Sequence, residues 1–189
     1  MFETLLAHID RFVKLSDTEQ QILTNHLSLQ HIGKKEYILN EGDVCNANYF
    51  IMKGLLRMYF IKDTGQEQTI QFALENWWIT DYTSLESRQP SGYFIQAIEN
   101  SEIAVLTKAN REILFQQIPQ LERYFRLLLQ RMHAANLMRI QYLFDLSVEE
   151  RYHQFNARFP EFVQRIPQYM LAVYLGFTPE VLSKIRAKK

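Results

Sequence analysis

The sequence predicts an α+β fold in which N-terminal helices lead into an antiparallel β-roll, followed by a long helix and a C-terminal helix-turn-helix. Two changes of hydrophobic period predict this order. Apolar residues recur at helical spacing up to about Gln30, alternate with a period of two from there to about Leu106, and return to helical spacing from Ala109. With 189 residues, of which 47 % are hydrophobic, the chain is long and apolar enough for a packed core.

The N-terminal part contains the patterns of two short helices. One apolar stripe marks the first helix and comprises Leu5, Leu6, Ile9, Phe12 and Val13. Ser16-Asp17-Thr18-Glu19 has the pattern of a capping box, in which a serine and a glutamate three residues later satisfy backbone N–H groups at a helix start. A second helix is therefore expected to begin after Ser16.

The central part predicts a compact antiparallel barrel or roll. Its apolar or alternating runs are short, and turn sequences rich in glycine and aspartate separate them. The runs are Tyr37–Leu39, Tyr49–Met52, Leu55–Ile61, Gln68–Leu74, Tyr93–Ile98 and Ile103–Leu106.

A long helix is predicted from Pro119 to about Asp145, because this stretch contains no further proline and no glycine. Arg139 interrupts an apolar seam along it, whose members are Leu121, Phe125, Leu128, Met132, Ala135 and Tyr142. Leu129 and Leu143 add a second stripe. Such a seam is typical of a helix that pairs with its twin across a two-fold axis. A helix that covers the roll is the alternative and accounts for the second stripe; both roles can hold at once.

The segment from Ile166 to Lys189 has the pattern of a helix-turn-helix. A short helix over Gln168–Leu175 is expected to end at Gly176, where the backbone takes a positive φ. Thr178-Pro179-Glu180 then combines an N-cap hydroxyl, a proline at the first helical position and an acid in the first turn. A surface αα-hairpin is the alternative for this segment.

Composition and motifs exclude several classes of protein. The 21 basic and 21 acidic residues cancel, but from Arg139 onward 8 basic residues stand against 5 acidic ones, which suits phosphate contact or a solvated tail. The one cysteine, Cys45, excludes a disulfide framework. The acid-containing N-terminus is no signal peptide and no run has the length of a membrane span, so a cytoplasmic location without a membrane partner is expected. Without a catalytic motif or metal-ligand spacing, neither an enzyme nor a cofactor or metal site is expected.

The order of these parts resembles the Crp/Fnr family of bacterial transcription regulators. Three motifs carry the resemblance: Gly33-x-x-x-Tyr37-Ile38-Leu39-x-x-Gly42, then Tyr49-Phe50-Ile51-Met52-x-Gly54, and the terminal helix-turn-helix. The resemblance implies a cyclic-nucleotide-binding-like sensor roll with N-terminal helices at 1–118, a dimerisation helix at 119–145 and a DNA-binding domain at 146–189. It also implies a palindromic double-stranded DNA partner, a homodimer through the long helix and contact with RNA polymerase.

Cyclic-nucleotide-binding members of this family use a Gly-Glu pair and a later Arg-Ser or Arg-Thr pair to hold the ribose and the cyclic phosphate. Here Thr80-Asp81 stands at the first pair and Ser91-Gly92 at the second, so the phosphate arginine is missing, with Arg88 nearby on the loop. Because burying an unpaired anion is costly, we expect no cyclic-AMP binding of the usual kind. The candidate pocket for another effector, neutral or aromatic, comprises Trp78, Asp81, Tyr82, Ser91, Tyr93 and Asn136.

Two alternatives stay open for these pocket residues. The aromatic members of the set can simply fill the core of the roll, which would leave a vestigial pocket. Asn136 can instead set the register of the dimer seam as a polar residue.

The resemblance also implies contacts to DNA from the second helix of the motif. The candidate DNA-binding residues are Thr178, Pro179, Glu180, Ser183, Lys184 and Lys188. Glu180 can accept from a cytosine amino group and Lys184 can donate to guanine, whereas Pro179 replaces a base-contacting arginine. Thr178, Ser183 and Lys188 are expected at phosphates. Arg186 is expected at the interior edge of the domain.

The segment from Ser147 to Arg165 shows no obvious strands, so the β-wing of the family is expected to be reduced or absent. The leading interpretation is a homodimeric, sequence-specific DNA-binding transcription regulator with a degenerate sensor roll. The alternative is a small-molecule-binding sensor or interaction module whose terminal helices contact protein and recognise no specific DNA site.

Overall fold

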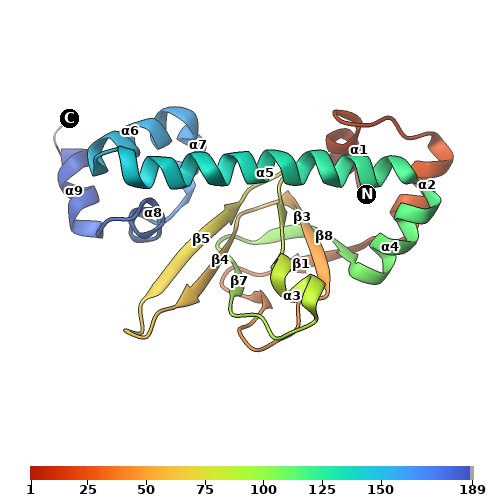
Figure 1. Ribbon diagram of the computed structural model, residues 1–189, viewed down its shortest axis with the longest axis horizontal. Helices are drawn as coiled ribbons and strands as arrows, with labels where there is room; N and C mark the ends of the chain where they lie inside the picture. Colours follow the sequence, from red (N-terminus) through yellow and green to blue (C-terminus); the bar gives the residue numbers. More distant parts are fainter. Residues whose placement is uncertain (188–189) are drawn as a thin grey trace. The chain divides into compact units, whose positions relative to one another are not determined.

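In the computed structural model, which describes residues 1–187, the predicted order of helices, roll, long helix and terminal helices is confirmed (Figure 1). The chain divides into two units between Leu129 and Gln130. Helix α5 (Pro119–Asp145) contributes residues to both units. The domain boundaries at 118 and 145 that the sequence suggests stay a prediction.

The capping box at Ser16 is confirmed, and it starts the second of two N-terminal helices. These helices are α1 (Glu3–Asp10) and α2 (Asp17–Asn25). Ser16 Oγ accepts from the backbone N–H of Glu19 at 3.3 Å, and Glu19 Oε2 accepts from the backbone N–H of Ser16 at 2.8 Å. The start of α2 is thus fixed by four neighbouring residues and needs no distant contact.

Two four-stranded sheets form the roll, with strand orders β1-β8-β3-β6 and β2-β7-β4-β5. Every pairing in both sheets is antiparallel, as the sequence predicts. Helix α3 (Tyr82–Ser87) lies between β6 and β7, and α4 (Lys108–Gln117) follows β8. The strands are β1 (Ser28–Ile32), β2 (Tyr37–Leu39), β3 (Ala47–Lys53), β4 (Leu56–Ile61), β5 (Glu67–Ala73), β6 (Trp78–Ile79), β7 (Phe94–Ala97) and β8 (Ser101–Thr107).

Two strands, β1 and β6, lie outside the runs that the sequence predicts. Strand β1 is at the edge of its sheet, and of its residues only Ile32 is buried, so it lacks a clear alternation of apolar side chains. Strand β6 is two residues long, which is too short for any period to appear. Both strands are recognised only through their neighbours in the sheet.

The inside of the roll is filled by side chains from both sheets. Tyr82 and Tyr93 pack against this core from partly buried positions. The buried members are Ile32, Leu39, Cys45, Ala47, Tyr49, Ile51, Leu56, Met58, Ala73, Ile79, Leu85, Ile95, Ala97 and Ile103. This packing agrees with the filled-core alternative.

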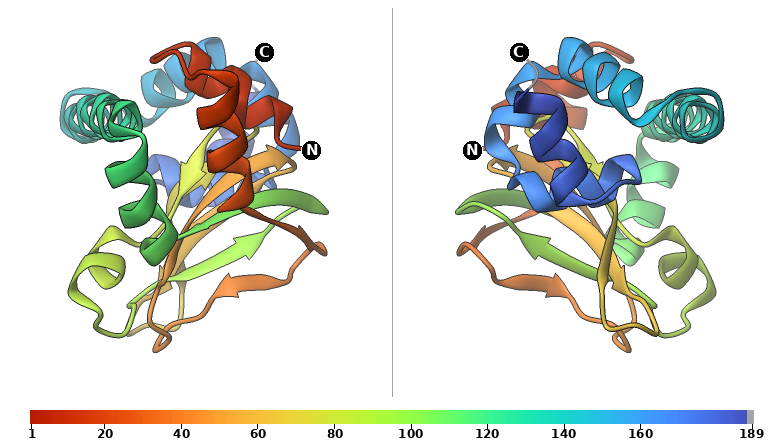
Figure 2. Two further views of the ribbon diagram at one scale, coloured as in Figure 1. Left: turned by 90° about the vertical axis from the view of Figure 1, so that its right-hand side faces the viewer. Right: turned by 90° about the vertical axis from the view of Figure 1, so that its left-hand side faces the viewer.

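An aromatic layer joins the β1-β8-β3-β6 sheet to α1 and the start of α5, which lie over the same side of the roll (Figures 1 and 2). The Trp78 ring lies 5.2 Å from Phe50 and 5.3 Å from Phe125, measured between ring centroids. Trp78 Nε1 donates to the hydroxyl of Tyr124 at 2.7 Å, and His8 Nδ1 lies 2.8 Å from the same oxygen. This layer therefore satisfies its polar atoms internally.

Helices are the only regular secondary structure among the described residues of the second unit. After α5 come α6 (Val148–Arg158), α7 (Pro160–Arg165), α8 (Gln168–Leu175) and α9 (Pro179–Ala187). No strand occurs between residues 146 and 187, so this range contains no β-wing. Its buried core comprises Tyr152, Phe162, Ile166, Met170, Leu171, Ala172, Leu175, Leu182 and Ile185.

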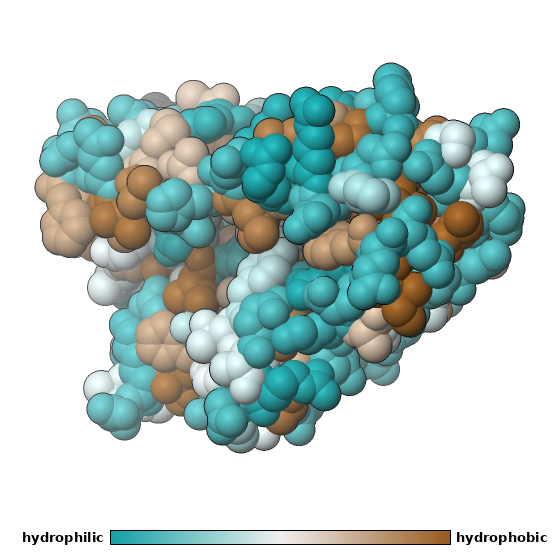
Figure 3. Space-filling model, turned by 45° about the vertical axis from the view of Figure 1, so that its right-hand side comes forward, coloured by the Kyte–Doolittle hydropathy of each residue, from teal (hydrophilic) through white to brown (hydrophobic). Residues whose placement is uncertain are grey.

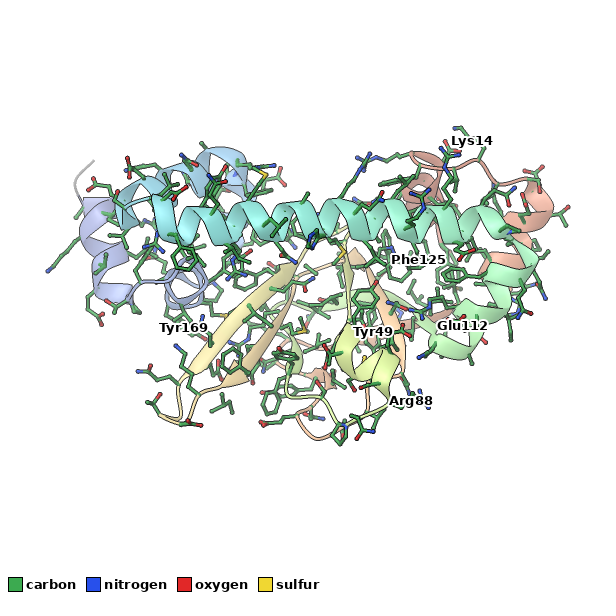
Figure 4. The ribbon with its side chains drawn as sticks, in the orientation of Figure 1. Lys14, Tyr49, Arg88, Glu112, Phe125 and Tyr169 are labelled. Carbon is green, nitrogen blue, oxygen red and sulfur yellow. The ribbon has the colours of Figure 1, made fainter. Side chains whose placement is uncertain are left out.

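The first half of the expected dimer seam on α5 is buried, whereas its later members Met132, Ala135 and Tyr142 are partly buried or exposed, so pairing through the long helix stays a prediction. Leu121, Phe125 and Leu128 of the expected dimer seam are buried, with exposed fractions of 1 %, 6 % and 9 %. Figure 4 shows Phe125 on the side of α5 that faces the strands. Leu129 and Leu143 of the second stripe are exposed instead. A helical period shows that a face is apolar, but it does not show what covers that face.

Exposed apolar side chains are distributed unevenly among the described residues. On the face drawn in Figure 3, hydrophilic side chains cover most of the surface and apolar ones occur in small groups. In the second unit, four large apolar side chains on one side of α5 are exposed. These residues, called the α5 apolar face below, are Leu137, Ile140, Leu143 and Phe144, and at 100° per residue they fall within an arc of about 120°.

Candidate functional site

The buried carboxylate of Asp81 is the centre of a hydrogen-bond network at the start of α3. Asp81 Oδ1 accepts from the backbone N–H groups of Thr83 at 2.9 Å and Ser84 at 3.3 Å, which makes Asp81 the N-cap of α3. Asp81 Oδ2 accepts from the hydroxyl of Ser91 at 2.7 Å. Both Asp81 and Ser91 are almost fully buried. The Asp81 carboxylate therefore already accepts hydrogen bonds from two backbone N–H groups and one hydroxyl group in this turn.

The residues around Asp81 close the same network. Thr80 Oγ1 donates to the carbonyl of Ala47 at 2.8 Å, and Ser84 Oγ donates to the carbonyl of Gln89 at 2.6 Å. Ser84 Oγ also accepts from the backbone N–H of Cys45 at 2.9 Å. The loop between β6 and β7 is therefore held to β3 by its own side chains.

Arg88 is exposed at the C-cap of α3, where its φ of 61° is left-handed. Figure 4 shows Arg88 at the outer edge of the roll, whereas Tyr49 lies inside it. The structure therefore does not bring Arg88 to the buried pair of Asp81 and Ser91.

The other candidate pocket residues fall into three places. Tyr82 and Tyr93 pack on the roll core near Asp81, and burial raises the pKa of the Tyr82 phenol to about 12. Trp78 points into the aromatic layer, because its neighbour Ile79 on β6 points into the roll and strand side chains alternate. Asn136 is exposed on the part of α5 that belongs to the second unit.

A buried arginine that the sequence does not single out ties α3 to α4. Arg111 Nη2 donates to Glu86 Oε1 at 2.7 Å, and Arg111 Nη1 donates to Asn48 Oδ1 at 3.2 Å. Lys108 Nζ lies 2.9 Å from the second oxygen of Glu86. Hydrogen bonding from Arg111 lowers the pKa of Glu86. No local sequence signal identifies such a residue, since its role depends on three separate elements.

The turn between α8 and α9 has the geometry that its sequence predicts. Gly176 has φ 82°, and its N–H donates to the carbonyl of Val173 at 3.1 Å. The N–H of Phe177 donates to the carbonyl of Ala172 at 3.0 Å, which completes a Schellman motif. Helix α9 begins at Pro179, as expected.

Helix α9 separates a buried side from a polar side. Leu182 and Ile185 are buried. Arg186 is exposed, so the expectation that it lies at the interior edge of the domain is wrong. Lys188 lies outside the described residues. The remaining candidate DNA contacts are all exposed, and these are Thr178, Pro179, Glu180, Ser183 and Lys184.

The exposed carboxylate of Glu180 lies at the start of α9, where it accepts hydrogen bonds. Hydrogen bonding from the Thr178 hydroxyl lowers the pKa of Glu180, and a backbone N–H contributes in the same direction. At neutral pH this exposed side chain is therefore an acceptor only, which is the form that can pair with an amino group.

Two further findings concern residues 1–187 as a whole. None of their helices combines the length and the hydrophobicity that crossing a bilayer requires. Within the same range, no three side chains of His, Cys, Asp or Glu come together in a way that could hold a metal ion.

The order of an antiparallel β-roll, a long helix and two terminal helices joined by a glycine turn defines the fold. The family model "Cyclic nucleotide-binding domain" matches residues 29–117. The chain is 26 % identical over 168 residues to the anaerobic regulatory protein of Pasteurella multocida, which covers 82 % of this chain and 60 % of that protein.

Solved structures share this fold. FixK2 from Bradyrhizobium japonicum aligns with a TM-score of 0.74 at 18 % identity, covering 86 % of this chain and 83 % of that chain. A transcriptional regulator of the Crp/Fnr family from Eubacterium rectale aligns with a TM-score of 0.69 at 18 % identity, covering 92 % and 83 %. Residues 29–117 thus match a cyclic nucleotide-binding domain, and the chain is similar to bacterial regulatory proteins and shares the fold of Crp/Fnr-family structures. It spans 60 % of the length of the Pasteurella relative.

Proposed function

We propose that this chain is a homodimeric transcription regulator that binds a palindromic DNA site through α9. The observation that carries the proposal is the arrangement of α9, which follows a glycine turn, buries Leu182 and Ile185, and exposes every described candidate contact. A helix held in this way can enter the major groove with its N-terminal residues at the base edges.

Two side chains are proposed to read bases. Glu180 is ionised and exposed, so it can accept from the amino group of cytosine, and Lys184, one turn later on the same side, can donate to guanine. Thr178, Ser183 and Lys188 are proposed to contact phosphates, which position the helix without selecting a sequence. RNA polymerase is a proposed further partner, as in regulators generally.

The α5 apolar face is proposed to form the two-fold contact of the dimer. Its members lie in the second unit together with α9, and their exposure in the single chain leaves an apolar surface that a second copy can cover. A two-fold dimer places one α9 at each half of a palindrome.

Selection of DNA from a random pool tests the function directly. The wild-type protein is expected to enrich a palindrome whose half-sites lie about one helical turn apart. Glu180→Ala is expected to relax the preference at one base pair in each half-site, at a cost of about 1–3 kcal/mol in discrimination. Glu161→Ala, which removes an exposed acid from α7, serves as the matched control and should leave the selected sequence unchanged.

Failure to enrich any sequence, with a folded and dimeric protein, would count against this function. In that case the alternative of a sensor or interaction module without a specific DNA site gains support. Repeating the selection with cell extract distinguishes that alternative from a requirement for an effector, because an effector in the extract would restore enrichment.

The roll is proposed not to bind cyclic nucleotides in the family's usual way. The buried Asp81 carboxylate already uses the Ser91 hydroxyl and two N–H groups of α3, and a phosphate beside it would add uncompensated negative charge. Cyclic AMP and cyclic GMP are therefore expected to leave the melting temperature unchanged.

Thermal melting with and without nucleotide measures this expectation. A ligand at 100 times its Kd stabilises by about 2.7 kcal/mol, which would raise Tm by roughly 5–10 °C. A rise of that size would contradict the prediction. Asp81→Ala removes the acceptor of three hydrogen bonds and should lower Tm, which shows that the assay detects changes at this place.

A further inference from the structure

Two arginines from different helices hold the carboxyl end of α8. Arg139 of α5 donates from Nη2 to the carbonyl of Tyr174 at 3.1 Å, and Arg151 of α6 donates from Nη1 to the carbonyl of Leu175 at 2.9 Å. The last carbonyls of a helix lack partners within it and carry partial negative charge. Both arginines therefore stabilise the end of α8 at the point where the chain turns toward α9.

The contact of Arg139 is more than one hydrogen bond. Its guanidinium carbon lies 4.0 Å from the centroid of the Tyr174 ring, in a cation–π arrangement. The planar guanidinium thus meets the ring and the carbonyl of the same residue at once, which fixes direction as well as distance. A lysine could supply the charge at this place but not the flat stacking surface.

Gly176 brings the same three helices close together. A Cβ at this position would lie 3.0 Å from Nη1 of Arg151 and 3.1 Å from Cδ2 of Leu143. The turn before α9 therefore packs directly on a member of the α5 apolar face and on the arginine from α6. Leu175 at the end of α8 and Leu182 and Ile185 of α9 are buried in the same unit, which fits close packing of α9 beside α8.

We infer that Arg139 is a positioning residue for DNA recognition, which sets the angle between α9 and the α5 apolar face and thereby the half-site spacing that the dimer accepts. The inference rests on the proposed function. If the two-fold contact lies on α5, the separation of the two α9 helices depends on how each is fixed to its own α5. Adding one base pair between half-sites moves one of them by about 3.4 Å and about 35° around the DNA axis. If α9 is rigidly attached to α5, the dimer binds the altered spacing poorly. If the attachment is loose, the dimer binds both spacings.

The test compares affinities for the selected palindrome and for versions with one base pair added or removed at its centre. The wild type is expected to prefer one spacing by roughly tenfold or more, the equivalent of about 1.4 kcal/mol. Arg139→Ala is expected to reduce that preference to about threefold or less, with the base preference within each half-site unchanged. Arg139→Lys should lie between the two, because it retains the charge without the stacked plane. Arg158→Ala, an exposed arginine of α6, controls for the loss of one positive charge.

Two results in the variants would overturn the inference. One is a wild-type spacing preference in Arg139→Ala. The other is an equal loss of affinity at every spacing together with a lower Tm, which would mean that Arg139 only supports the fold. Should Arg139→Ala fail to fold, Arg139→Lys and Arg151→Ala provide the same comparison. If the wild type selects no palindrome, both the proposed function and this inference are contradicted. This outcome is seen before any variant is made, so it is distinguishable from a failure of the inference alone.

Discussion

The variant Gly54→Ala is expected to have a melting temperature well below that of the wild type. Gly54 has φ 105°, a conformation that side chains rarely adopt. A Cβ there would also overlap the Ser101 hydroxyl and would lie 2.7 Å from Ser101 Cβ and 2.8 Å from its Cα. Ser101 belongs to β8, and β8 is paired with β3. Moving the backbone of Ser101 away from the new Cβ would therefore disrupt this pairing. We expect a loss of about 3 kcal/mol and a fall in Tm of roughly 6–12 °C.

Gly42→Ala separates the steric overlap from the backbone conformation. Gly42 also has a positive φ, of 90°, but a Cβ there would meet no atom within 4 Å. This variant is expected to lose only the conformational part, about 1–2 kcal/mol. Equal Tm values for the two variants would show that the close approach of β8 to Gly54 contributes nothing. Thermal melting followed by circular dichroism gives both values.

Ile140→Asp is expected to convert the dimer into a monomer and to abolish binding to the palindrome. Ile140 is 50 % exposed at the middle of the α5 apolar face. In a two-fold contact one substitution places two carboxylates in the same interface, and burying them unpaired costs about 3 kcal/mol or more. The dimer dissociation constant should therefore rise by about 100-fold or more. Sedimentation equilibrium measures this change, and a DNA titration measures its effect on binding.

Met138→Asp is the matched control for this prediction. Met138 is 38 % exposed on the same helix, but two residues away it faces almost the opposite direction. The control variant should stay dimeric. If both variants dissociate equally, the contact is not confined to the α5 apolar face. If neither does, the dimer uses another surface, and the proposed placement of the two α9 helices is wrong.

Helices α8 and α9 could be predicted almost to the residue because their boundaries are encoded locally. Gly176 ends α8 with a positive φ, and Thr178 with Pro179 begins α9, so no distant contact is needed to place either end. The capping box at Ser16 is a second case. The short strands β1 and β6 could not be predicted from the sequence, since each is defined by pairing with a strand far away in the sequence.

The roles of faces and buried polar groups were harder to predict than helix boundaries. The periodicity of α5 revealed two apolar stripes, but only the packing of Phe125 on Trp78 shows which stripe is covered. Arg139 stood out as an interruption of a seam, and its contact with Tyr174 gives the reason. Asp81 and Ser91 were recognised as departures from the family's pattern, whereas the bond between them required the fold.

Two adjacent tryptophans give the roll a natural pair of optical reporters. Trp77 is 40 % exposed, while Trp78 is 4 % exposed and donates its indole N–H to Tyr124 in the aromatic layer. Their emission should therefore differ in wavelength and in access to a soluble quencher such as iodide. A movement of the start of α5 relative to the sheet would change the emission of buried Trp78 and leave the emission of exposed Trp77 unchanged. The chain thus reports on its own interior without an added label.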